Sequence, residues 1–341
     1  MSGTAVPRIP LLVDCDPGID DALALLYLAG SPEADLRAVT CTGGNVEARQ
    51  VAANAQAILA LAGRPEVEVA LGREGPIARP LVTTPETHGP QGIGDATLPE
   101  PRTPLSLRGG PELIVEEARR HPGALTLVTL APLTNLAVAI ALEPRLPWLL
   151  RRVVTMAGAF RGDGNTHPTT EWNATVDPEA FAEVLAAFAP ERAPAGTPPP
   201  PRPVIVPLEV TESHHLVAAD VERIATLAGG GDDPVTRFIR DALAFYFRFH
   251  AEYDGFHGAY IHDALAVAAA LDPGLISTTP LTVDVETAGR LTSGETVADR
   301  RGRWGRPPNA DVAVRADTAT FHDRLLARLA TVAREQRGSA A

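Results

Sequence analysis

Two apolar segments separated by an acidic turn stand near the start of the chain. Residues 9–13 (Ile-Pro-Leu-Leu-Val) predict a buried strand, and residues 22–28 predict an apolar helix. The turn between them holds four aspartates: Asp14, Asp16, Asp20 and Asp21. A strand that passes through a polar turn into a helix is typical of the carboxyl edge of a parallel sheet, where sites form in open α/β folds.

The aspartates allow two interpretations. Asp20 and Asp21 suit a helix N-terminus, where capping and the helix dipole favour negative side chains. That interpretation does not account for Asp14 and Asp16 upstream. Carboxylates packed this closely cannot all stay ionised without a cation, and their hard oxygens suit Ca²⁺ or Mg²⁺ better than zinc. We therefore expect a metal or catalytic site, with Asp263 as a later acidic candidate.

Strand-like and helix-like segments alternate through the first half of the chain. This rhythm predicts an α/β fold with a mostly parallel, Rossmann-like open sheet, helices on both faces and extra C-terminal strands. The expected strands after the first are residues 36–41, 67–71, 125–130, 152–156, 204–207, 281–285, 295–299 and 311–314.

One Pro-rich insertion interrupts the rhythm. Residues 190–203 include four consecutive prolines at 198–201 and predict an extended surface segment. Because the alternation resumes at residue 204, we expect a single domain over residues 1–341.

Composition excludes several classes of function. A net charge of −12 disfavours nucleic acid and anionic membranes, and no apolar stretch predicts a membrane span or a signal peptide. Only Cys15 and Cys41 are present, which fits a reducing cytoplasm. The chain contains no lysine, so Schiff-base chemistry, pyridoxal phosphate attachment and a Walker-A phosphate loop are excluded.

Further polar residues follow other expected strands. Asn45 follows the second strand, and Asn135 follows the one at 125–130. The loop after residue 156 carries Asn165, Glu171 and Asn173, and His262 with Asp263 opens a later helix. Each signal is weak alone, since asparagine is common at helix caps and turns. Their shared place at strand ends indicates one site.

These motifs resemble the inosine–uridine-preferring nucleoside hydrolases. The resemblance begins with Asp-Cys-Asp-Pro-Gly-Ile-Asp-Asp-Ala at residues 14–22 and runs from about residue 11 to 314. The acidic octet and the late His-Asp pair are the segments most specific to this family. The other matching segments are residues 44–45, 88–92, 132–135, 156–159, 171–173, 176–179 and 262–264.

The resemblance implies a Ca²⁺-dependent catalytic group. Asp16 matches a general base that also contacts calcium, Asp21 a bidentate ligand, and Asp263 the last carboxylate ligand. Leu130 matches the position that gives a backbone carbonyl to the ion. His262 matches the acid that assists the leaving base.

The resemblance also implies a ribose subsite. Asp20 matches the contact to the 2′-hydroxyl, with Asn45 nearby, and Met156 packs against the sugar. His88 matches a loop histidine near the base. The residues that match ligands of the 3′- and 5′-hydroxyls are Asn165, Glu171 and Asn173. The implied partner is a small ribonucleoside, and the implied assembly is a homodimer or homotetramer.

The expected reaction is hydrolysis of the N-glycosidic bond of a ribonucleoside, giving base and ribose. Cleavage develops positive charge on the ribose ring, which a ring of carboxylates stabilises better than it stabilises the neutral substrate. Two alternatives remain open at this stage. Asp-x-Asp after a strand is also the nucleophile motif of haloacid-dehalogenase-like phosphatases, and a ribonucleoside-binding protein without catalysis would need the same sugar contacts.

Overall fold

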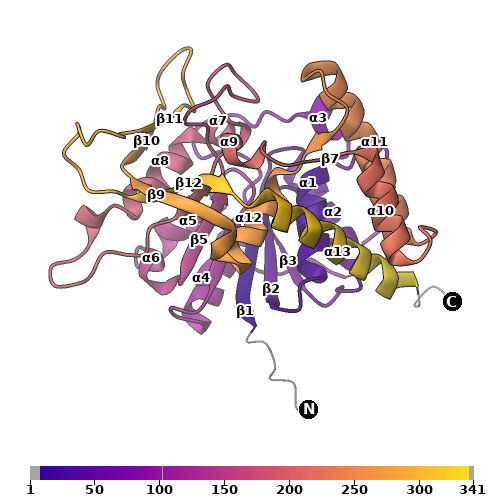
Figure 1. Cartoon of the computed structure of the whole chain (residues 1–341). Coiled ribbons are helices and arrows are strands. Elements are labelled where there is room, and N and C mark those ends of the chain that lie inside the picture. The colour runs from indigo at the N-terminus through magenta and orange to yellow at the C-terminus, as the bar shows by residue number, and fades with distance from the viewer. Residues whose placement is uncertain (1–7, 102, 338–341) are drawn as a thin grey trace.

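An eight-stranded sheet forms the centre of the protein (Figure 1). The computed structural model describes residues 8–101 and 103–337. The strands of the sheet lie in the order β3-β2-β1-β4-β5-β6-β12-β9, and all are parallel to their neighbours except the edge strand β9. Their bounds are β1 Ile9–Cys15, β2 Ala34–Cys41, β3 Glu68–Leu71, β4 Thr126–Thr129, β5 Arg152–Met156, β6 Val204–Val206, β12 Ala310–Ala316 and β9 Ile276–Leu281.

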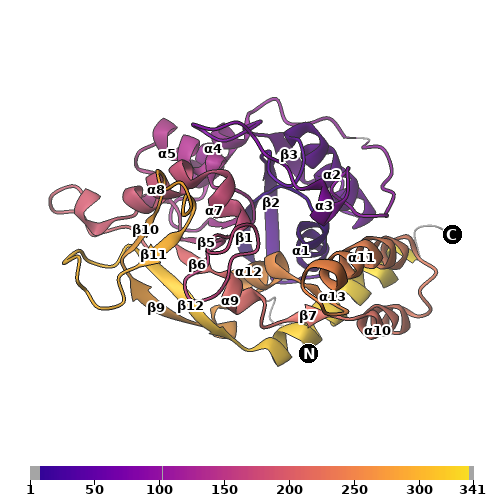
Figure 2. The same ribbon diagram turned by 90° about the horizontal axis from the view of Figure 1, so that it is seen from above.

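Helices cover both faces of this sheet (Figure 2). The first face is covered by α1 Ile19–Ala29, α2 Ala48–Leu61, α10 Ala218–Ala228, α11 Pro234–Tyr253, α12 His262–Leu271 and α13 Thr318–Arg337. The second face is covered by α4 Gly110–Arg120, α5 Thr134–Leu142, α6 Leu146–Leu149 and α8 Pro178–Ala187.

Short elements fill the connections. They are α3 Pro85–His88, α7 Trp172–Val176, η1 Pro190–Arg192, α9 Leu208–Thr211 and η2 Pro273–Leu275. Two antiparallel pairs stand apart from the main sheet: β7 His215–Leu216 with β8 Ala259–Tyr260, and β10 Val283–Val285 with β11 Thr296–Ala298.

The start of α1 follows from its burial. The helix is apolar almost all round because it is buried between the sheet and the helices α12 and α13. No residue from Ala22 to Ala29 carries a charge. It begins at Ile19, three residues earlier than the apolar run predicts, so Asp20 and Asp21 fall in its first turn. This places both carboxyls at the carboxyl edge of the sheet.

The predicted fold class is confirmed, with differences in detail. The strand expected at 311–314 is β12, which lies inside the main sheet, parallel to β6. The expected strand 281–285 is divided between the end of β9 and β10. Helix α10 and most of β9 were not predicted, and α3 lies within the long segment after residue 72, where no element was predicted.

The Pro-rich segment lies against the second face. Residues 193–203 contain no helix or strand, and Trp148 Nε1 donates a hydrogen bond to the Pro198 carbonyl at 2.8 Å. Neither of the two 20-residue helices, α11 and α13, nor any shorter helix in the described ranges has the apolar length needed to cross a bilayer.

Candidate active site

A pocket of about 310 Å³ opens at the carboxyl edge of the sheet. It receives side chains from the loops after β1, β2, β4 and β5 and from the ends of α11 and α12. The predicted residues that line it are Asp20, Asn45, His88, Leu130, Met156, Asn165, Glu171, Asn173, His262 and Asp263. Residues far apart in sequence therefore meet in one pocket, as their positions after the strands predicted.

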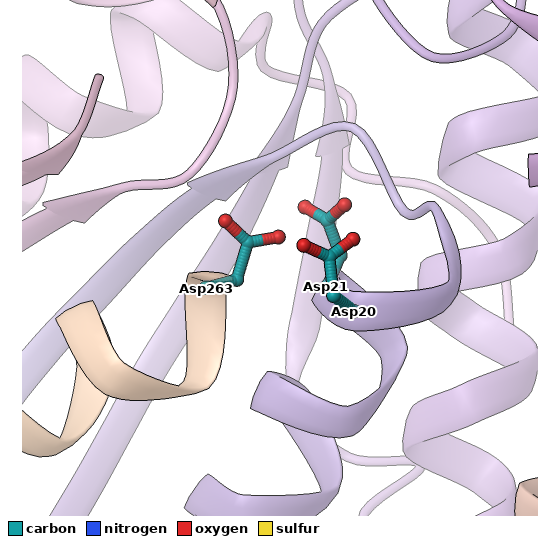
Figure 3. Close-up of side chains that lie close together, drawn as sticks. All are labelled: Asp20, Asp21 and Asp263. Carbon is teal, nitrogen blue, oxygen red and sulfur yellow. The ribbon is translucent and has the colours of Figure 1, made fainter. Parts of the chain in front are cut away.

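Three carboxyl groups face one another at this edge of the sheet (Figure 3). Two of them, Asp20 and Asp263, line the pocket, whereas Asp21, like Asp16, is not part of the lining. Asp20 and Asp21 come from the first turn of α1, and Asp263 comes from the first turn of α12. One oxygen of each lies within 4.8 Å of the others.

Asp16 lies beside this cluster with one oxygen free. Its Oδ2 accepts the Asn45 backbone N–H at 2.7 Å, whereas its buried Oδ1 has no hydrogen-bond partner within the described residues. A Cβ at Gly44 would lie 2.0 Å from Asp16 Oδ2, so only glycine permits this approach. The backbone N–H of Asp16 donates to Asp21 Oδ1 at 3.2 Å, which ties the two residues together.

Burial changes the acidity of the whole cluster. Desolvation, with repulsion from Asp21, raises the pKa of Asp20 to about 8 and that of Asp16 well above its usual range. Desolvation raises the pKa of Asp21 to about 6, although backbone N–H groups of Gly18 and Asp16 oppose the shift. The pKa of Asp263 is also raised well above normal, by desolvation and by neighbouring aspartates. The pocket therefore holds more carboxylate than it can ionise unaided.

These observations fit a hard divalent cation. A cation among Asp16, Asp21 and Asp263 would remove the repulsion between the carboxylates and supply a partner for the free Asp16 oxygen. The only donors here are oxygen atoms, which excludes a preference for soft metals at this position. Asp20, which was expected to serve the sugar, lies in the same cluster as Asp21 and Asp263.

The fourth aspartate of the octet lies outside the pocket. Asp14 is still within β1, and its side chain points to the second face of the sheet. There Asp14 Oδ1 accepts the Thr40 hydroxyl at 2.6 Å and the Asn135 amide at 2.7 Å. Desolvation raises its pKa to about 7. Asp14 and Asn135 therefore do not line the pocket; they are hydrogen-bonded to each other on the second face of the sheet.

The loops after β4 and β5 are joined by one amide group. Asn173 Nδ2 donates to the carbonyls of Leu130 at 2.8 Å and Met156 at 3.0 Å. Glu171 is buried and caps α7, accepting from the backbone N–H groups of Asn173 and Ala174 at 2.7 and 3.0 Å. The predicted sugar ligands are thus held in place by one another.

The remaining predicted sugar and base residues have different surroundings. Asn45 Nδ2 donates to the Asp16 carbonyl at 3.1 Å. Asn165 is exposed at the rim, where its Oδ1 accepts the Trp172 backbone N–H at 3.0 Å. His88 Nδ1 accepts the Ile19 backbone N–H at 3.2 Å, so the neutral ring of His88 carries its hydrogen on Nε2.

His262 is buried at the start of α12. Its Nδ1 lies 2.7 Å from the hydroxyl of Thr211, the last residue of α9. Burial lowers the pKa of His262 to about 3, and nearby His250 and His88 add to the shift. The ring is therefore neutral at neutral pH.

His250 also lines the pocket and was not predicted from the sequence. Its Nδ1 lies 2.5 Å from Asp254 Oδ2, while its buried Nε2 has no partner within the described residues. Tyr246 and Phe249 flank it and also line the pocket. The spacing of His250 and Asp254, four residues apart on a helix, is the signal that was available.

A second hollow, about 560 Å³ in volume, lies away from these groups. It is bounded by Ile77, Trp148 and small apolar side chains of α5 and α8. Although larger, it lacks a convergent set of polar groups. We therefore assign the chemistry to the smaller, polar pocket.

Known proteins are similar to this chain in sequence and in fold. The family profile described as inosine-uridine preferring nucleoside hydrolase matches residues 11–323. Two relatives, each a pyrimidine-specific ribonucleoside hydrolase RihA, come from Enterobacter sp. (strain 638) and Salmonella paratyphi C (strain RKS4594). They are 36% and 35% identical to this chain, covering 94% of it and 98% of each relative.

A solved structure agrees with these sequence matches. The purine-preferring ribonucleoside hydrolase from Gardnerella vaginalis superposes with a TM-score of 0.87 at 29% identity, covering 96% of this chain and 99% of that chain. The matched region includes every residue that lines the polar pocket. The chain therefore belongs to the inosine–uridine-preferring nucleoside hydrolase family.

Proposed function

We propose that the polar pocket hydrolyses the N-glycosidic bond of ribonucleosides with one Ca²⁺ held by Asp16, Asp21, Asp263 and the Leu130 carbonyl. The observation that carries this proposal is the meeting of Asp21 and Asp263, from opposite parts of the chain, beside an unpartnered Asp16 oxygen. When bound, Ca²⁺ supplies positive charge that keeps the carboxylates ionised and gives oxygen ligands of water and ribose a fixed place.

Asp16 is the proposed general base. The reaction exchanges the C1′–N bond for a C1′–O bond, and the attacking water must lose a proton as the new bond forms. Within residues 8–101 and 103–337, Asp16 Oδ1 is the oxygen of this side chain that has no hydrogen-bond partner. A carboxylate is a weak base, but attack on an oxocarbenium-like ribose needs little help.

His262 is the proposed assistant of the leaving base. When the C1′–N bond breaks, its electron pair stays on the base nitrogen, which is then stabilised by a hydrogen bond or a proton. The ring of His262 lines the pocket and is anchored at Nδ1, which leaves Nε2 for the substrate. The sugar contacts are proposed for Asp20, Asn45, Met156, Asn165, Glu171 and Asn173, and His88 is proposed to lie near the base.

Neither alternative function is favoured. The family match and the full-length structural likeness are to ribonucleoside hydrolases, and not to haloacid-dehalogenase-like phosphatases. His262, the proposed assistant of the leaving base, lines the pocket, and Asp16, the proposed base, is hydrogen-bonded to Asp21 of the aspartate cluster, which argues against a protein that binds ribonucleosides without cleaving them. Because the named relatives differ in base preference, both pyrimidine and purine ribosides belong in the assay.

Metal removal tests the proposal. Uridine, cytidine, inosine and adenosine are incubated with the enzyme in excess chelator and again after Ca²⁺ is restored, and released ribose is measured as reducing sugar. We expect activity on at least one riboside to disappear and return. Full activity in excess chelator would contradict the Ca²⁺ requirement.

Substitution of Asp16 tests its role. Asp16→Asn keeps the shape of the side chain but removes the base, so we expect kcat to fall about 10²–10⁴-fold. The matched control is Asp35→Asn. Asp35 lies near the start of β2, at the edge of the sheet away from the pocket, so this variant should keep wild-type activity. An active Asp16→Asn enzyme would exclude Asp16 as the base.

We also propose a cytoplasmic homodimer or homotetramer. Both cysteines are free and buried, which suits a reducing compartment. The assembly rests on the family resemblance, and it is open to a direct mass measurement.

A further inference from the structure

The buried contact between Thr211 and His262 joins two elements at the sheet edge. Thr211 ends α9, which follows β6, and His262 begins α12. The Thr211 hydroxyl and His262 Nδ1 are 2.7 Å apart, and both residues are buried. Among the described residues, Thr211 is the only side chain hydrogen-bonded to the His262 ring.

The threonine hydroxyl has one hydrogen and two possible acceptors. The Leu208 carbonyl lies 3.2 Å from Thr211 Oγ1, which is long for an O–H donor, and it already accepts the Glu212 backbone N–H at 2.8 Å. His262 Nδ1 is closer, at 2.7 Å. The shorter distance to His262 Nδ1, and the hydrogen bond that the Leu208 carbonyl already accepts, both favour donation from Thr211 to His262.

This assignment decides which ring nitrogen of His262 carries hydrogen. When Nδ1 accepts, the neutral ring carries its hydrogen on Nε2. Nε2 belongs to a residue that lines the pocket and makes no protein hydrogen bond in the described part of the chain. In the opposite arrangement Nε2 would be an acceptor and could not donate to a leaving base, in a pocket that Asp20 and Asp263 also line.

The other two pocket histidines lack this dependence on a hydroxyl. A backbone N–H fixes His88 Nδ1 as an acceptor, and the Asp254 carboxylate fixes His250 Nδ1 as a donor in the neutral ring. Only His262 pairs with a group that can donate or accept. Its tautomer therefore depends on how the threonine hydrogen is directed.

We propose that Thr211 is a positioning residue that holds the His262 ring with its Nε2–H directed at the leaving base. This inference rests on the proposed role of His262 and adds the group through which that role is set. Thr211 does not line the pocket, so we assign it no contact with the sugar and place its effect in the hydrogen bond to His262.

Paired substitutions test this role. Thr211→Val replaces the hydroxyl by a methyl of similar size, and Thr211→Ser retains the hydroxyl. On the best natural riboside we expect Thr211→Val to lower kcat about 10- to 100-fold with KM changed less than about threefold, a smaller loss than in His262→Ala. Thr211→Ser should recover most of kcat.

A second substrate separates positioning from general damage. A 4-nitrophenyl riboside has a leaving group that needs no hydrogen bond, so its kcat should change less than about threefold in both Thr211 variants. Ring ¹⁵N shifts of His262 provide a readout besides activity: the Nε2–H form should dominate in the wild type and be lost in Thr211→Val.

Three results would overturn the inference. They are wild-type kcat in Thr211→Val on the natural riboside, an equal loss on the activated riboside, and unchanged ¹⁵N shifts. If His262→Ala itself keeps full kcat, the proposed role of His262 fails first. If His262→Ala is slow while Thr211→Val is not, only the role of Thr211 fails.

Discussion

The carboxyl groups of Asp21 and Asp263 come from opposite parts of the chain and meet at the starts of two buried helices. Neither group has a basic partner within the described residues, and desolvation raises the pKa of both. A folded protein keeps such an arrangement only where it serves a ligand, because unpaired buried carboxylates are costly. The acidic cluster therefore destabilises the metal-free protein and provides the means to bind a cation.

A dependence of stability on pH follows from this cluster. The pKa of Asp20 is raised to about 8 and that of Asp14 to about 7, mainly by desolvation, whereas the unfolded carboxyls titrate near pH 4. The metal-free folded state thus binds more protons, so its free energy of unfolding falls as pH rises toward these pKa values. Buried histidines whose pKa is lowered reduce the free energy of unfolding only below about pH 6.5. Above that pH they do not contribute to the change that the carboxyls cause.

We expect denaturant unfolding of the metal-free protein to show a loss of about 2 kcal/mol between pH 6.5 and 8.5. Excess Ca²⁺ should reduce this loss, since a cation held by Asp21 and Asp263 would favour the ionised form of the neighbouring Asp20. Metal-free stability that stays level or rises over this interval would contradict the account.

Single residues also show how far the sequence could predict the site. The octet, the late His-Asp pair and the polar residues after strands predicted one site, and the structure brings most of them into or beside one pocket, whereas Asp14 and Asn135 are hydrogen-bonded to each other outside it. The residue pattern alone did not separate Asp14 from Asp16, because their surroundings depend on where β1 ends; only the family resemblance gave a role to Asp16 and none to Asp14. His250 was missed because its meaning depends on the pocket that surrounds it.

At the level of elements, short helices and loops hold the site. Helix α7 is five residues long, too short to be stable alone, and its cap is the buried carboxylate of Glu171. Each Glu171 oxygen accepts from this helix, and Oε2 also accepts the Gly158 backbone N–H at 2.9 Å. One side chain therefore fixes both α7 and the loop after β5.

Removal of that carboxylate should loosen both segments. We expect Glu171→Ala to lower the free energy of unfolding by about 2–3 kcal/mol, because three buried N–H donors lose their acceptor. Glu171→Gln keeps one oxygen and should lose less. Urea denaturation of both variants gives the comparison, and an Ala variant as stable as the wild type would show that the cap is dispensable.

Elements differed in how well the sequence predicted them. The buried parallel strands have continuous apolar runs and were found. Strand β9 has exposed residues between its buried ends and a proline at 280, so neither alternation nor an apolar run marks it. Helix α10 has buried residues at Val221, Ile224, Ala225 and Ala228, a helical spacing that was sufficient to predict it.

On the scale of the whole molecule, the order of the strands creates the site. Strands β2, β1, β4 and β5 are neighbours, so the loops that follow them share one edge, and α12 adds Asp263 from the first face. This order joins segments by long-range pairing that local sequence patterns do not encode. The sequence analysis therefore predicted a mostly parallel sheet but no strand order.

The proposed homodimer or homotetramer can be tested by its mass. Light scattering of the purified protein should give two or four times the chain mass of 35.9 kDa. A mass of one chain at assay concentration would contradict the proposed homodimer or homotetramer, while leaving the chemistry of the pocket intact.

We expect one Ca²⁺ to bind both Asp21 and Asp263. The decisive measurement is a crystal structure determined with Ca²⁺ and a non-hydrolysable ribonucleoside analogue. It should show a single strong peak about 2.3–2.6 Å from carboxylate oxygens of both residues, with ribose hydroxyls completing its ligands. A pocket that holds the analogue without density between Asp21 and Asp263 would exclude this calcium site.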